Sequence, residues 1–226
     1  MRHRGWITCI MALAVILLTG PAIHAQIIPL FDNLNRTPAS SGIVTATTWQ
    51  AQQFKTDGQA YALVSVTLEM RQFSGPGSPE VSIWSNHVEG SSSRPDIALG
   101  TLTNPGSIPG SFTPITFTST GLSLSANSTY WVVMKSTASG ADFLWRNTAD
   151  NNPTGAGPGF STVWSETITS GSTWVTTSTN PYLMKVDVQA VPEPSSFVLA
   201  GLGLGAMGLI RRRMKKRVTP DQVPSV

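Results

Sequence analysis

The chain contains very little cysteine and histidine. Its single cysteine, Cys9, lies in an apolar run near the N-terminus, so residues 26–226 contain none and can form no disulfide. Of three histidines, only His87 lies beyond residue 25. One histidine without cysteine cannot supply the nitrogen and sulfur ligands of a common zinc site, and a serine–histidine triad would depend on this one residue. We therefore expect no cofactor, no metal and no enzymatic activity.

Charge is also sparse, because charged residues make up 12% of the chain against about 25% in ordinary globular domains. The formal net charge of +3 comes from the two ends. Residues 26–190 hold seven basic and ten acidic residues and are therefore mildly acidic. Binding to nucleic acid needs a basic surface that displaces counterions from phosphates, so we exclude that class of partner.

The N-terminus has the order of a secretory signal. Arg2 and Arg4 precede an apolar run over residues 7–18, and a helix-breaking glycine and proline lead to Ala25. The alternative is a permanent anchor, but 12 residues are too few to cross a hydrocarbon core about 30 Å thick. We predict a signal peptide over residues 1–25, with cleavage after Ala25.

The body of the chain alternates apolar and polar residues with a period of two, as half-buried strands do. Apolar side chains occupy alternate positions at Ala62, Val64, Val66, Leu68 and Met70, and again at Tyr182, Met184, Val186 and Val188. Residues 129–135 are apolar on both phases, which is typical of a strand buried on two sides. Glycine- and proline-rich turns separate these runs. We predict one all-β domain over residues 26–190, an antiparallel, jelly-roll-like β-sandwich of about eight to ten strands.

Several polar side chains of the body are candidates for a catalytic or metal site. His87 is assigned to a polar loop after a strand. Glu166 is the best single carboxylate for a glycoside hydrolase, although such enzymes need a pair. The oxygens of Asp150, Asn151 and Asn152 suit either a calcium ion or a turn, and we favour the turn.

Tryptophans offer a different kind of site, because an indole ring can pack in a core or stack on a sugar. We assign Trp131 to the core, since its neighbours are apolar. Trp164 and Trp174 lie among serines and threonines and are the candidate glycan-binding residues. A carbohydrate-binding module therefore stays open as an alternative function.

The C-terminus combines a rigid motif, an apolar segment and a basic cluster. Pro192, Glu193 and Pro194 precede 14 mostly apolar residues, 197–210. As a helix these span about 21 Å, which makes a marginal transmembrane segment. The basic residues that follow would hold the end in the cytoplasm: Arg211, Arg212, Arg213, Lys215, Lys216 and Arg217. We assign residues 191–217 to an anchor segment with one transmembrane helix, and residues 218–226 to a cytoplasmic tail.

This tail resembles the PEP-CTERM sorting signal of Gram-negative bacteria. The resemblance implies that Pro192, Glu193 and Pro194 are recognised by an exosortase, a membrane transpeptidase that cuts near them. It further implies export, transient anchoring in the inner membrane, and association with exopolysaccharide or biofilm.

The body resembles the choice-of-anchor R type domain. The resemblance rests on the order of the motifs LFDNLN, WQAQQF, YALVSVTLEM, VSIWSN, LGTLTNP and LSANSTYWVV. It implies a fold and a surface location rather than a mechanism. The expectation is an exported, non-enzymatic protein delivered to the cell envelope or extracellular matrix.

Overall fold

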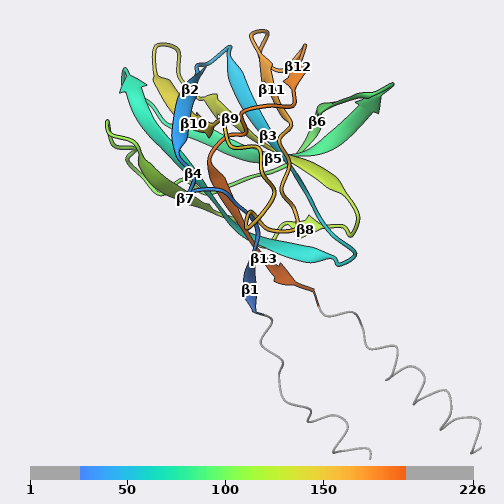
Figure 1. Cartoon of the computed structure of the whole chain (residues 1–226). Helices are drawn as coiled ribbons and strands as arrows, with labels where there is room; N and C mark the ends of the chain where they lie inside the picture. Colours follow the sequence, from blue (N-terminus) through green and yellow to red (C-terminus); the bar gives the residue numbers. More distant parts are fainter. Residues whose placement is uncertain (1–25, 192–226) are drawn as a thin grey trace, which may run out of the picture. The chain divides into compact units, whose positions relative to one another are not determined.

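The computed structural model describes residues 26–191, which contain thirteen strands joined by turns and loops (Figure 1). They are β1 (Ile27–Asp32), β2 (Pro38–Val44), β3 (Trp49–Lys55), β4 (Tyr61–Ser74), β5 (Pro79–Glu89), β6 (Ser92–Thr101), β7 (Thr113–Thr118), β8 (Ser123–Leu124), β9 (Thr129–Ser136), β10 (Asp142–Thr148), β11 (Trp164–Thr167), β12 (Val175–Thr177) and β13 (Met184–Ala190). The chain divides into two units, Met1–Ala190 and Val191–Val226, and all these strands belong to the first. Over residues 26–191 we find no helix with the length and apolar character needed to cross a membrane.

The strands form two antiparallel sheets that share one apolar core. Sheet A has the order β1-β13-β4-β10-β2, and β7 and β8 also pair with β4. Sheet B has the order β12-β11-β3-β9-β5-β6. This confirms the predicted antiparallel β-sandwich. The strand number exceeds the eight to ten predicted, in part because β8 and β12 have only two and three residues, too few to show an alternation.

The predicted alternation of buried and exposed side chains is confirmed in β13 and only in part in β4. All four predicted apolar positions at the β13 end are buried: Tyr182, Met184, Val186 and Val188. In β4 the burial phase changes, because Tyr61 and Leu63 enter the core in place of Ala62 and Val64. The register against β13 shifts at this point. A β-bulge inserts one unpaired residue, so every side chain on one side of it moves to the other face.

Strand β9 is buried on both faces, as predicted. Tyr130, Val132 and Met134 join the core between the sheets. Trp131 and Val133 face the other way and pack with Ala51 of β3 in a second, smaller cluster. Further tryptophan rings pack on this cluster, so the outer face of sheet B carries its own small apolar core.

Buried amide side chains fix the segment that leads into β13. Asn33, which is fully buried, donates to the Tyr182 carbonyl (3.0 Å) and accepts from the Met184 amide (2.7 Å). Gln52 Oε1 accepts from the Tyr182 amide (2.8 Å), and the Tyr182 hydroxyl donates to Gln50 Oε1 (2.8 Å). These bonds satisfy backbone groups that the sheets leave unpaired, and they hold Tyr182 in one position.

Two buried tyrosines make the fold sensitive to alkali. Burial, together with the Asp57 carboxylate that accepts the hydroxyl (2.9 Å), raises the pKa of Tyr61 to about 12. Burial and the charge of Glu166 also raise the pKa of Tyr182. An unfolded tyrosine ionises near pH 10, so above that value the unfolded chain releases protons that the folded chain keeps.

We therefore expect the free energy of unfolding to fall as the pH rises from about 10 to about 12. Urea unfolding at several pH values in this range measures the slope. Tyr61→Phe removes one of the two groups and should flatten the slope. The same slope in both proteins would contradict the assignment to Tyr61.

Candidate binding cleft and sorting signal

The candidate site lies between two hairpins of sheet B. The β5–β6 hairpin turns through Gly90 and Ser91, and the positive φ of Gly90 (61°) is what a two-residue type II′ turn requires at its first position. The two end strands of sheet B, β12 and β6, are in contact, and the Thr176 hydroxyl of β12 donates to the Ser93 carbonyl of β6 (3.0 Å). The loops of the β5–β6 and β11–β12 hairpins therefore face each other.

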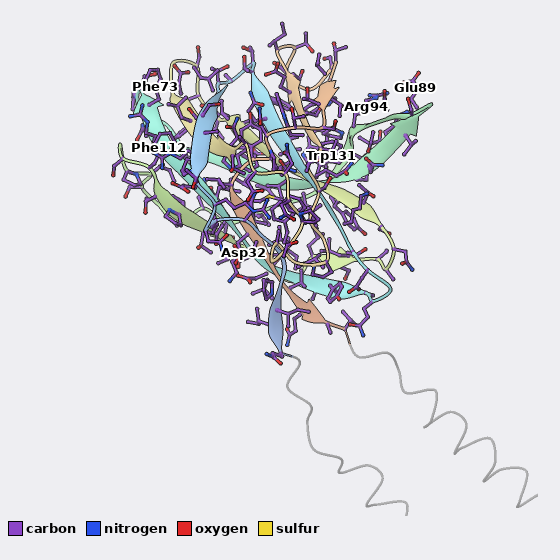
Figure 2. The ribbon with its side chains drawn as sticks, in the orientation of Figure 1. Asp32, Phe73, Glu89, Arg94, Phe112 and Trp131 are labelled. Atoms are coloured by element: carbon purple, nitrogen blue, oxygen red, sulfur yellow. The ribbon has the colours of Figure 1, made fainter. Side chains whose placement is uncertain are left out.

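A cleft of about 420 Å³ opens between these hairpins. Its lining combines one aromatic ring, one acid, one base and several hydroxyls: Glu89, Ser92, Arg94, Ser172, Thr173, Trp174 and Thr176. Figure 2 shows Glu89 and Arg94 at the outer end of the β5–β6 hairpin. Arg94 Nη2 lies 3.6 Å from Glu89 Oε2, and the Glu89 side chain is 76% exposed. The volume is typical of a site for a small ligand.

A cluster of tryptophan rings packs against Trp174 on the side away from the cleft opening. The rings of Trp49, Trp84 and Trp174 meet edge to face, with centroids 6.2 to 6.4 Å apart, and Trp131 is buried beneath them. Mutual edge-to-face contacts are a favourable arrangement for aromatic rings. Trp174 is thereby held in place although it belongs to a loop between two short strands.

Three of the four indole N–H groups in this cluster have a hydrogen-bond acceptor among the described residues. Trp49 donates to the Ala46 carbonyl (3.0 Å), Trp84 to the Ser82 hydroxyl (2.8 Å) and Trp131 to Asn86 Oδ1 (2.8 Å). The indole N–H of Trp174, the ring that lines the cleft, has no acceptor within residues 26–191. It can therefore donate to a ligand.

Local hydrogen bonds fix the β11–β12 loop over the tryptophan cluster. The Thr167 hydroxyl accepts from the amides of Thr169 (3.2 Å) and Gly171 (3.3 Å). Gly171 has a positive φ of 86°, and a β-carbon there would lie 2.6 Å from the Trp49 ring. Only glycine lets the loop approach Trp49 this closely.

The two tryptophans predicted from the sequence lie on opposite faces of sheet B. Trp164 packs against the core between the sheets, meets the Tyr182 ring edge-on at 5.6 Å and donates to the Thr179 carbonyl (2.5 Å). Trp174 lines the cleft on the other face. The prediction for Trp131 is confirmed, since this residue is fully buried.

The structure corrects the predicted position of one residue, His87, and locates another candidate, Glu166. His87 lies inside β5 opposite Arg94, not in a loop after the strand, because the β5–β6 hairpin extends to Glu89. Glu166 is half-buried in β11 and accepts from Gln50 Nε2 (3.4 Å). Among the residues that the structure describes, no group of three or more histidine, cysteine or acidic side chains is placed to hold a metal ion.

The loop of Asp150, Asn151 and Asn152 forms turns, as favoured from the sequence. Asp150 Oδ1 accepts from the Asn152 amide (2.9 Å), and Asn152 Oδ1 accepts from the Thr154 amide (2.9 Å). Arg36 donates to the Asp150 carbonyl (2.7 Å) and places its positive charge in the loop. These side-chain oxygens therefore accept hydrogen bonds from backbone amides, as they do in Asx turns.

The remaining predicted site residues lie outside the described residues. They are Ala25, Pro192, Glu193 and Pro194, and the basic cluster of Arg211, Arg212, Arg213, Lys215, Lys216 and Arg217. The sequence itself identifies this segment, because residues 190–215 match the PEP-CTERM protein-sorting motif. The chain carries a PEP-CTERM sorting motif. A search of curated proteins gives no significant match.

The position of this PEP-CTERM motif agrees with the architecture. The match begins at residue 190, the last residue of β13, so the motif starts where the sandwich ends. It contains Pro192, Glu193 and Pro194 and the first basic residues after the apolar segment. The motif indicates export, transient membrane association at the C-terminus and processing by an exosortase-type enzyme.

Proposed function

We propose that this chain is a non-enzymatic protein of the cell envelope or exopolysaccharide matrix. Its parts follow the order of export: a signal peptide over residues 1–25, a sandwich over 26–190, an anchor over 191–217 and a cytoplasmic tail over 218–226. An exosortase cuts the anchored chain near Pro192, Glu193 and Pro194 and delivers the sandwich to its final location. The observation that carries the proposal is the sorting motif directly after the last strand of the sandwich.

The physical chemistry of the chain fits this order. The sandwich has no cysteine and is held by apolar burial and hydrogen bonds, so it needs no oxidative step after export. An apolar segment of 14 residues is a marginal membrane span, which suits an anchor that is later removed. The basic cluster resists translocation and keeps the chain at the membrane until it is cut.

Replacing Pro192, Glu193 and Pro194 with alanines tests the sorting step. We expect the variant to stay in the membrane fraction with its C-terminal tail, whereas the unchanged protein loses the tail. Fractionation and the intact mass of the product measure both. Ser195→Ala with Ser196→Ala is the matched control beside the motif and should be processed normally. A variant with the size and location of the unchanged protein would refute sorting through residues 192–194.

The second candidate function is carbohydrate binding. The observation that favours it is the cleft lined by Trp174, Arg94 and Glu89 on a fixed tryptophan cluster. The two functions are compatible, since a matrix protein needs a means of attachment. The resemblance to the choice-of-anchor R type domain supports a surface location in both cases.

A further inference from the structure

We propose that the cleft between the β5–β6 and β11–β12 hairpins binds one pyranose ring of a neutral polysaccharide, with Trp174 as the stacking surface. This inference rests on the proposed glycan-associated function and gives it a site. Of the two glycan-binding tryptophans predicted from the sequence, Trp164 and Trp174, only Trp174 belongs to the proposed site. Trp164 is excluded because it packs on the opposite face of sheet B with its N–H already bonded.

The lining has the chemistry that a sugar ring requires. One face of a pyranose carries C–H groups, which pack on the electron-rich face of an indole. Its hydroxyls both donate and accept, and the cleft offers a partner for each role. Arg94 supplies fixed donors, Glu89 supplies acceptors, and the Trp174 N–H adds a donor that no described residue uses. Hydroxyls of Ser172 and Thr173 can play either role.

The cleft is preformed rather than created by the ligand. Trp174 is held by Trp49 and Trp84, and the loop before it is tied to the body by the Ser170 amide, which donates to the Thr47 carbonyl (3.0 Å). The facing hairpin is tied in by Gln53 Nε2, which donates to the Ser93 hydroxyl (2.8 Å). A ligand that binds between fixed walls loses less free energy to ordering the protein.

The same lining disfavours other ligands. A polyanion would meet only one base, Arg94, whose charge is balanced by Glu89 at 3.6 Å. A wholly apolar ligand would remove the solvation of both charged groups without replacing it. A neutral, hydroxylated ring with one apolar face matches the aromatic, acidic, basic and hydroxyl side chains of the cleft.

Binding to immobilised polysaccharides tests the site. The full chain is purified in a detergent without a sugar headgroup and titrated onto dextran, galactomannan and xylan, with alginate as the anionic arm. We expect at least one neutral polysaccharide to bind. Trp174→Ala and Arg94→Gln should each weaken it about tenfold, which is the effect of losing one stacking contact or charged hydrogen bond. Trp174→Phe keeps an aromatic ring but loses the N–H. Its affinity for the polysaccharide should therefore lie between that of the unchanged protein and that of Trp174→Ala.

Trp164→Phe is the matched control. It changes the tryptophan outside the cleft and should leave the affinity within about twofold of that of the unchanged protein. Arg94 is partly exposed, so Arg94→Gln keeps the test valid even if Trp174→Ala unfolds.

Several results would overturn the inference. If Arg94→Gln and Trp174→Phe both bind like the unchanged protein, the sugar lies elsewhere. If only alginate binds, the ligand is anionic. If no polysaccharide binds, the ligand class is wrong, and processing at residues 192–194, measured separately, still decides the sorting function.

Discussion

Replacing Trp131 with alanine is expected to lower the free energy of unfolding by about 3–5 kcal/mol, the usual range for deleting a buried tryptophan. Trp131 is fully buried, although it lies on the outer face of sheet B. Its N–H donates to Asn86 Oδ1, and Asn86 in turn accepts from the Ser93 hydroxyl of β6. The substitution therefore opens a cavity. It also removes one donor from the series of side-chain hydrogen bonds that links β6 to the rest of the sheet.

Urea unfolding of the full chain, followed by circular dichroism, measures this loss. Trp84→Ala is the matched control, because Trp84 packs on the same cluster but is only half-buried. Its loss should be clearly smaller than that of Trp131→Ala. A loss below about 1 kcal/mol for Trp131→Ala would mean that the outer face of sheet B is not a packed core.

This second core explains how the cleft keeps its shape. The β11–β12 loop is short of apolar residues of its own, and it rests on Trp49 through Gly171. The rings of Trp49, Trp84 and Trp174 extend from the layer of Trp131 to the cleft. Stability of the outer face and geometry of the cleft are therefore linked through the same side chains.

The sequence predicted the fold class because strand alternation is a local signal. Lys185 and Asp187 separate the apolar residues of β13 cleanly, so only one phase is possible. In β4 the residues Tyr61, Ala62, Leu63 and Val64 are all apolar, so both phases are possible before the bulge. Nothing local reveals that the bulge exists, because it is defined by the pairing with β13.

The cleft could not be predicted in the same way. Its two walls lie about eighty residues apart in the chain, and they meet only because the end strands of sheet B, β12 and β6, are in contact. Trp164 and Trp174 both have serine and threonine neighbours, so their surroundings in sequence do not separate them. The face of sheet B on which Trp164 lies is set by the strand register, because Trp164 pairs with Gln52, whose side chain points between the sheets. The PEP-CTERM motif, by contrast, is a continuous segment and can be recognised without the fold.

Gly42→Ala is expected to cost about 2–4 kcal/mol, because the position has no room for a methyl group. A β-carbon at Gly42 would lie 2.0 Å from the Tyr182 hydroxyl and 2.9 Å from its ring carbon Cζ. Tyr182 cannot move aside, since its ring stacks on Trp145 (4.6 Å) and its hydroxyl donates to Gln50. Gly58→Ala is the matched control, because a β-carbon there meets nothing within 4 Å, and its effect should stay within about 0.5 kcal/mol.

A double-mutant cycle identifies Tyr182 as the cause. Tyr182→Phe removes the hydroxyl that clashes, so it should be destabilising alone but should relieve part of the cost of Gly42→Ala. We expect the double variant to be more stable than the sum of the two single effects by about 1 kcal/mol or more, as for residues in direct contact. Chemical unfolding of the four proteins gives this coupling. If the losses of the two single variants were strictly additive, the cost of Gly42→Ala would not come from contact with Tyr182. That result would contradict the close packing of β2 against the segment that enters β13.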